Sequence, residues 1–173
     1  MKDLPPPSPW RSLSERQAKK VDAVSAAFLS NLKYVTDRRL QKAYYLAEVW
    51  SIEERLERLS EVDFASWRHG PWSLHVRESE ERLESKGVVE RIIKPARGGL
   101  EVELLRVTKP SGSSALARDE LEFLVEVSAA LRFIDSEKLT QVAKATAPFR
   151  VTSPEARIDL YELSPITQRS AST

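Results

Sequence analysis

Residues 37–59 read DRRLQKAYYLAEVWSIEERLERL, and this stretch decides the fold. Apolar side chains recur in it at the spacing of one helical face, as at Leu40, Tyr44 and Ala47. Further apolar residues widen that face well beyond a single seam: Tyr45, Leu46, Val49, Ile52 and Leu56. A helix that is apolar over so much of its circumference is usually packed from two sides. We therefore expect this segment to form the central helix of a mainly helical protein.

The chain before this segment predicts another helix. Ser14 and Gln17 have the spacing of a capping box, in which each side chain accepts the other residue's backbone N–H. Apolar residues then recur at helical spacing: Val21, Val24, Phe28 and Leu32. This helix is expected to end near Tyr34. Residues 1–12 are rich in proline and lack periodicity, so we expect a flexible leader there.

The chain after the central helix predicts a β-hairpin and further helices. The expected elements are a helix at 73–87 capped by Ser73, strands at 88–95 and 100–108, and helices at 115–133 and 136–146, the last capped by Ser136. Arg97-Gly98-Gly99 supplies the turn between the strands, and Pro148 ends the last helix.

This element order places the chain in the mainly α class with a small β-hairpin. We expect one domain over 13–150, followed by an extension at 151–173 that is partly disordered. Helical periodicity also breaks between Glu61 and Arg68, where the chain looks extended. Arg68-His69-Gly70-Pro71 then forms a turn, because proline biases the residue before it away from the helical region.

The composition excludes several classes of protein. The 173 residues include 27 basic and 26 acidic side chains, so the formal net charge of +1 gives little overall attraction to nucleic acid or anionic lipid. Cysteine is absent, which excludes disulfides and thiolate metal sites. No segment has the apolar length of a signal peptide or of a membrane span. A cytoplasmic, soluble protein is expected.

The sequence shows no motif of a catalytic centre. It has no nucleophile elbow, no phosphate-binding glycine loop and no dinucleotide fingerprint. The two histidines, His69 and His75, lack further ligands at the spacing that a zinc or iron site needs. We expect no enzyme activity, and no catalytic residue, cofactor or bound metal.

The order helix, helix, hairpin over residues 37–109 is that of a winged-helix segment, so a DNA-binding transcriptional regulator is an alternative. The hairpin offers Arg91, Lys94 and Arg97 as possible contacts to nucleic acid. The helix at 73–87, however, is net negative, and a duplex-binding face needs phosphate contacts from both elements. Nucleic acid is therefore the less favoured partner.

Three stretches together resemble the Panacea (SocA-like) domain family. They are Leu40-Gln41-Lys42-Ala43-Tyr44-Tyr45-Leu46-Ala47, then Phe64 to Pro71, then Ser136 to Phe149. The first is similar to that family's Lys-Leu-x-Tyr-x-Ala helix, and the second to its segment leading into Gly-Pro. Ala147 and Phe149 stand where the family usually has histidine and tryptophan. The resemblance covers residues 36–150.

The resemblance implies an antitoxin that neutralises a toxin by direct protein–protein binding, the toxin being encoded next to it. Because interface hot spots favour Trp, Tyr and Arg, the candidate partner-binding residues are Tyr45, Trp50, Trp67, Arg68, His69 and Trp72. Trp72, beside Pro71, is expected to be the most exposed of these tryptophans. A further alternative is a phage or mobile-element accessory protein that binds a host factor, for example as a protease adaptor.

Overall fold

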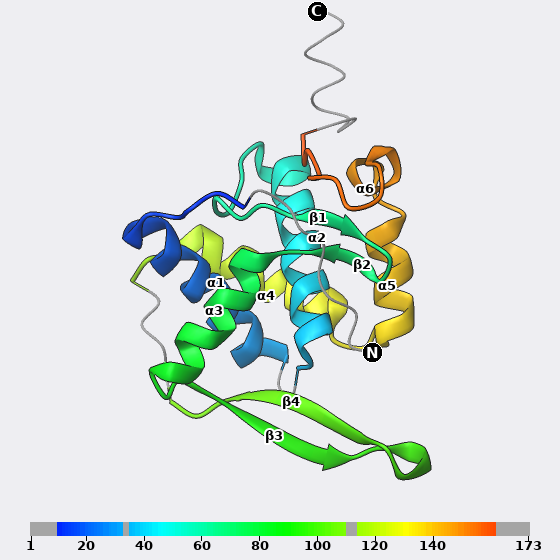
Figure 1. Cartoon of the computed structure of the whole chain (residues 1–173). Coiled ribbons are helices and arrows are strands. Elements are labelled where there is room, and N and C mark those ends of the chain that lie inside the picture. Colours follow the sequence, from blue (N-terminus) through cyan, green and yellow to red (C-terminus); the bar gives the residue numbers. More distant parts are fainter. Residues whose placement is uncertain (1–9, 33–34, 110–113, 162–173) are drawn as a thin grey trace, which may run out of the picture.

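The computed structural model describes residues 10–32, 35–109 and 114–161 (Figure 1). The helices are α1 (Glu15–Leu32), α2 (Asp37–Arg55), α3 (Leu74–Ser85), α4 (Arg118–Leu131), α5 (Ser136–Lys144) and α6 (Ala147–Val151). Two antiparallel hairpins pair β1 (Ala65–Trp67) with β2 (Gly70–Trp72), and β3 (Val89–Pro95) with β4 (Glu101–Val107). The mainly α class with a small β-hairpin is confirmed. The hairpin of β1 and β2 was not predicted.

The predicted central helix is α2, which packs against α1, α3, α4, α5 and β2. Its residues from Leu40 to Val49 are buried without interruption. Two neighbouring tyrosines, Tyr44 and Tyr45, pack on Phe64 with ring centroids 6.1 and 5.3 Å away. A helix contacted on so many sides explains why its sequence is apolar around most of its circumference.

The end of α2 corrects the prediction that it reaches Leu59. The helix stops at Arg55 because Leu56 adopts the left-handed region at φ 64 while its N–H still bonds the Ile52 carbonyl. Ser51 also donates its hydroxyl to the Glu57 carbonyl at 2.6 Å, which holds the chain in this turn. Leu56, expected on the buried face, is therefore 67% exposed.

The starts of α1 and α3 agree with the sequence prediction. The capping box of α1 is present, with the Ser14 N–H 2.9 Å from Gln17 Oε1 and the Gln17 N–H 3.1 Å from Ser14 Oγ. Ser73 caps α3 by accepting the Val76 N–H at 3.3 Å. The predicted end of α1 near Tyr34 lies outside the described residues, since the helix is defined to Leu32.

Two predictions near the chain's last helices are wrong. Asp135, not Ser136, caps α5, because its carboxylate accepts the Lys138 N–H at 2.8 Å. Pro148 does not end α5, which already stops at Lys144, but lies in the first turn of the short helix α6, where proline's missing N–H costs no hydrogen bond.

The hairpin of β3 and β4 projects from the helical body (Figure 1). Its base is tied down by Leu105, which is buried and exchanges backbone hydrogen bonds of 2.7 and 3.3 Å with Val35. The order expected of a winged-helix segment is present as α2, α3 and this hairpin, with β1 and β2 inserted between the helices.

The chain after α6 belongs to the same body. Residues 155–158 run beside β1, where the Ser66 N–H donates to the Ala156 carbonyl at 2.9 Å and the Ile158 N–H to the Phe64 carbonyl at 2.8 Å. Ile158 joins the hydrophobic core. The extension predicted at 151–173 is therefore packed as far as residue 161, and its remainder lies outside the described residues.

The start of the described chain is packed as well. Arg11 donates from Nε to Asp63 Oδ2 at 2.8 Å, and the Trp10 ring lies edge-on to Trp72 with centroids 5.7 Å apart. The leader predicted at 1–12 is thus ordered from Trp10 onward, and residues 1–9 lie outside the described residues. None of the described helices is long and apolar enough to cross a membrane.

Candidate functional site

The turn between β1 and β2 is built around Gly70, in the motif Arg68-His69-Gly70-Pro71. Gly70 has φ +110, a conformation that side-chain-bearing residues rarely adopt, and a Cβ there would lie 3.4 Å from Cε of Lys42. Gln41 of α2 holds the following Ser73 from both sides, accepting its N–H at 2.8 Å and donating to its carbonyl at 2.9 Å. The central helix therefore fixes where the turn lies.

A cavity of about 400 Å³ opens beside this turn, and we name it the cationic pocket. Its walls come from the start of α2, from the turn and from α5: Thr36, Arg38, Lys42, Arg68, His69, Ser136, Glu137, Thr140 and Lys144. Four of these side chains are cationic and one is acidic. The pocket is therefore strongly positive in a protein that is nearly neutral overall.

Lys42 is the unusual member of the cationic pocket. It is only 5% exposed, and it makes no hydrogen bond or ion pair with any residue that the structure describes. Burial, with smaller contributions from Arg38 and Lys144, lowers the pKa of Lys42 to about 8. Burial, followed by the surrounding cations, also lowers the pKa of His69, which favours its neutral imidazole.

A second cavity of about 670 Å³ is also lined by Arg68, and we name it the aromatic groove. It is lined by β1, the β1–β2 turn, the end of α5, α6 and the chain that follows α6: Ser66, Trp67, Arg68, Lys144, Phe149, Arg150, Thr152, Pro154 and Glu155. Trp67 and Phe149 are half-buried in it. The Arg68 guanidinium lies 5.5 Å from the centre of the Trp67 ring, in a cation–π arrangement.

The two cavities share Arg68 and Lys144. The Lys144 ammonium donates to the Arg68 carbonyl at 2.5 Å, which ties α5 to the β1–β2 turn between the cavities. Together they form one continuous cationic face, with aromatic side chains on one half and a buried lysine on the other.

No family model, curated protein or solved structure matches this chain. The resemblance to Panacea domains therefore depends on the sequence motifs alone.

Three of the predicted partner-binding residues, Trp67, Arg68 and His69, lie together at this face. Tyr45 does not, and this corrects its assignment. It is fully buried in the core, where its hydroxyl lies 2.7 Å from Thr146 Oγ1 and burial raises its pKa to about 12. A partner has no access to this side chain.

The other two predicted tryptophans lie away from the two cavities. Trp50 is half-buried and packs against the hydrophobic core. Trp72, expected to be the most exposed, is half-buried like Trp50 and Trp67, because Trp10 covers it edge-on. Its interaction with the start of the chain gives it a structural role.

Sequence reasoning missed Arg38, Lys42, Lys144, Phe149 and Arg150 as members of this face. For Lys42 a signal was present. A lysine within a helix that is apolar on nearly every side must be buried, paired or functional, because charged side chains are otherwise kept at the surface. The other four lie far along the chain from the turn, or on helix surfaces whose neighbours the pattern does not reveal.

The residues proposed for nucleic acid are less available than the sequence indicated. Arg91 donates to Glu84 and Glu103 at 2.8 Å and to Asp37 at 2.9 Å, and it lies 3.3 Å from Glu80. A guanidinium held by so many carboxylates has little capacity left for phosphate. The other two, Lys94 and Arg97, lie in the exposed outer part of the hairpin.

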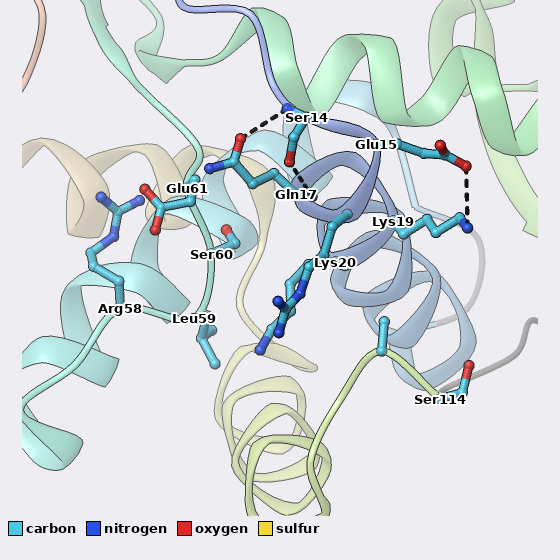
Figure 2. A pocket seen from close by; sticks show the side chains of 12 residues that line it. Ser14, Glu15, Gln17, Lys19, Lys20, Arg58, Leu59, Ser60, Glu61 and Ser114 are labelled. Atoms are coloured by element: carbon cyan, nitrogen blue, oxygen red, sulfur yellow. Dashed lines mark hydrogen bonds and ion pairs between the residues drawn. The ribbon is translucent and has the colours of Figure 1, made fainter.

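A hollow of about 1120 Å³ lies between the start of α1, the segment at 58–61 and residues 114–115 (Figure 2). Much of its charge is neutralised within the fold. Lys19 pairs with Glu15 at 3.3 Å, as drawn in Figure 2, and Lys20 pairs with Glu120 at 2.8 Å. We assign no function to this hollow.

Among the residues that the structure describes, no group of three acidic or imidazole side chains could hold a metal ion.

Proposed function

We propose that this chain is the antitoxin of a toxin–antitoxin pair and that it neutralises its toxin by direct binding. The aromatic groove is the observation that carries the proposal. Its lining combines two aromatic side chains, Trp67 and Phe149, with the arginines Arg68 and Arg150. Tryptophan and arginine are the residue types that dominate the binding energy of protein interfaces.

The charge of the groove indicates the kind of toxin segment that fits it. Arg68, Lys144 and Arg150 face a single carboxylate, Glu155, among the residues that line it. A segment that places an apolar or aromatic side chain between Trp67 and Phe149, with acidic side chains on either side, would complement this surface.

The groove is also held firmly in shape. One wall, β1, is paired both with β2 and with residues 155–158. On the other wall, Thr152 closes the last turn of α6 by donating its hydroxyl to the Pro148 carbonyl at 2.6 Å. A surface that is formed before binding loses less conformational entropy when the partner docks, and this favours tight association.

Coexpression with the neighbouring reading frame tests the proposal. We expect that frame to be toxic alone and harmless beside this protein, and we expect the two proteins to purify together. Trp67→Ala should weaken the complex by about tenfold or more and reduce protection, since it removes the tryptophan that lines the groove.

Phe133→Ala is the matched control, because Phe133 is 90% exposed and lines neither cavity. It should leave both the complex and the protection unchanged. A neighbour that is harmless alone, or that stays lethal beside this protein, contradicts the antitoxin proposal. Equal effects of the two substitutions would contradict the assignment of the groove.

A further inference from the structure

The cationic pocket has a composition that an acidic protein partner does not account for. Arg38 and Lys42 come from α2, Arg68 from the turn and Lys144 from α5, so four positive charges from three elements converge on about 400 Å³. Neither Arg38 nor Lys42 is paired with a carboxylate of any described residue. This excess of positive charge costs free energy in the empty protein, and a bound anion would remove that cost.

Lys42 indicates that the anion enters the pocket. Lysine ordinarily extends its ammonium to bulk water along an apolar surface. Here the stem lies beside Gly70, where an added Cβ would be 3.4 Å from Lys42 Cε, and the residue is 95% removed from solvent while lining the cavity. Lys42 has no partner among the described residues and it lines the cavity, so its ammonium is placed to meet a ligand there.

The neutral groups of the pocket add hydrogen-bond donors. Thr36 Oγ1 accepts the Arg39 N–H at 3.1 Å, which leaves its own hydrogen to donate, and the Ser136 hydroxyl makes no bond to a described residue. The Thr140 hydroxyl is already used on the Ser136 carbonyl at 2.9 Å. The pocket therefore has many N–H and O–H donors, from these hydroxyls and from the cationic side chains. They exceed what the two oxygens of one carboxylate can accept, whereas a phosphate group offers three terminal oxygens.

We propose that the cationic pocket binds the phosphate or diphosphate group of a small ligand, held by Lys42, Arg38 and Lys144 with the hydroxyls of Thr36 and Ser136. A cavity of about 400 Å³ lies within the range of small-molecule sites. The proposal goes beyond the antitoxin function and does not depend on it, because the site is complete within this chain.

The first test is calorimetric titration of the full chain with phosphate, pyrophosphate and glutamate, at constant ionic strength with chloride as the background anion. We expect saturable binding of phosphate and tighter binding of pyrophosphate, which brings more charge into the same site. Failure of both to bind at millimolar concentration overturns the proposal. So does glutamate that binds as tightly as pyrophosphate, since the site would then recognise carboxylates.

Variants locate the binding. Lys42→Met keeps the length of the side chain and should weaken pyrophosphate binding by about tenfold or more. Arg38→Met should also weaken it, and because Arg38 is exposed this variant tests the site without disturbing the core. Glu137→Gln should tighten binding by about two- to fivefold, because it removes the one carboxylate of the pocket.

Lys138→Met is the matched control, since it removes the same charge from α5, the helix that carries Lys144, while Lys138 does not line the pocket. It should leave the affinity unchanged. An equal loss in the Lys42 and Lys138 variants would show diffuse attraction to the cationic face and would overturn the proposed site. These outcomes are independent of any toxin, so they separate this inference from the antitoxin proposal.

Discussion

Glu80 is a fully buried carboxylate in α3, and its Oε1 atom has no hydrogen-bond partner among the described residues. Its other oxygen lies 3.3 Å from both Arg77 and Arg91. Burial, followed by the nearby Asp37 carboxylate, raises the pKa of Glu80 to about 8 despite the two arginines. At neutral pH this side chain therefore holds its proton in the folded protein.

The raised pKa predicts how stability depends on pH. Because the unfolded chain releases this proton near its ordinary pKa of about 4.5, the folded state binds it more tightly. The contribution of Glu80 to stability is complete below that value, and it is lost as the pH rises toward about 8. Glu80→Gln should therefore raise the free energy of unfolding at pH 9 by about 4 kcal/mol more than at pH 5, since each pKa unit is about 1.4 kcal/mol.

Urea unfolding at the two pH values measures this effect. Glu81→Gln is the control, since Glu81 is exposed on the same helix and should show no such difference. If Glu80→Gln destabilises the protein equally at both pH values, then the carboxylate is ionised and paired in the fold.

At the scale of elements, the residue that ends α2, Leu56, has a strained backbone conformation. Leu56 has φ 64 and its side chain is 67% exposed, so it gains little from burial while occupying a conformation that suits glycine. Leu56→Gly should stabilise the protein by about 0.5–1 kcal/mol, measured by thermal unfolding.

Leu100→Gly provides the comparison for that prediction. Leu100 is 69% exposed but has φ −80, an ordinary conformation. Glycine there only adds freedom to the unfolded chain and should be neutral or destabilising. A loss of stability in Leu56→Gly as large as in Leu100→Gly would mean that the left-handed residue is not strained.

At the scale of the whole molecule, Asp63 joins the two ends of the described chain. It is 5% exposed and accepts hydrogen bonds from Arg11 at 2.8 and 2.9 Å and from Arg157 at 2.6 Å. His75 supports the same junction, because its Nδ1 accepts the Asp63 N–H at 3.0 Å and its Nε2 lies 2.8 Å from the Arg11 carbonyl.

Asp63→Asn should therefore loosen both ends at once. We expect a loss of about 2–4 kcal/mol in the free energy of unfolding, since a buried charge network loses its anion, and faster tryptic cleavage at Arg11 and Arg157. Glu61→Gln is the control, because Glu61 is exposed and lies 4.0 Å from Arg11. Slow cleavage at both arginines in Asp63→Asn would show that the ends are held by apolar packing alone.

Much of the element order could be predicted from the sequence because the signals are local. The caps at Ser14 and Ser73 bond backbone groups three residues away, and the turn at Gly98-Gly99 uses positive φ values that glycine accepts. Such signals act within a few residues, so they are readable without knowledge of the fold. The Gly70-Pro71 turn was predictable for the same reason, because its signal is local, and with it the neighbouring residues Trp67 and Arg68.

Only the tertiary structure decided what surrounds that turn. The cationic pocket combines Arg38 and Lys42 with Lys144, about a hundred residues further along the chain, and the aromatic groove brings Phe149 to Trp67. The sequence by itself determined the helices, the hairpin of β3 and β4 and the position of the turn, because hydrogen bonds and apolar periodicity are local. Burial of Lys42, withdrawal of Tyr45 into the core and formation of the two cavities depend on packing between distant segments, and no pattern along the chain specifies that packing.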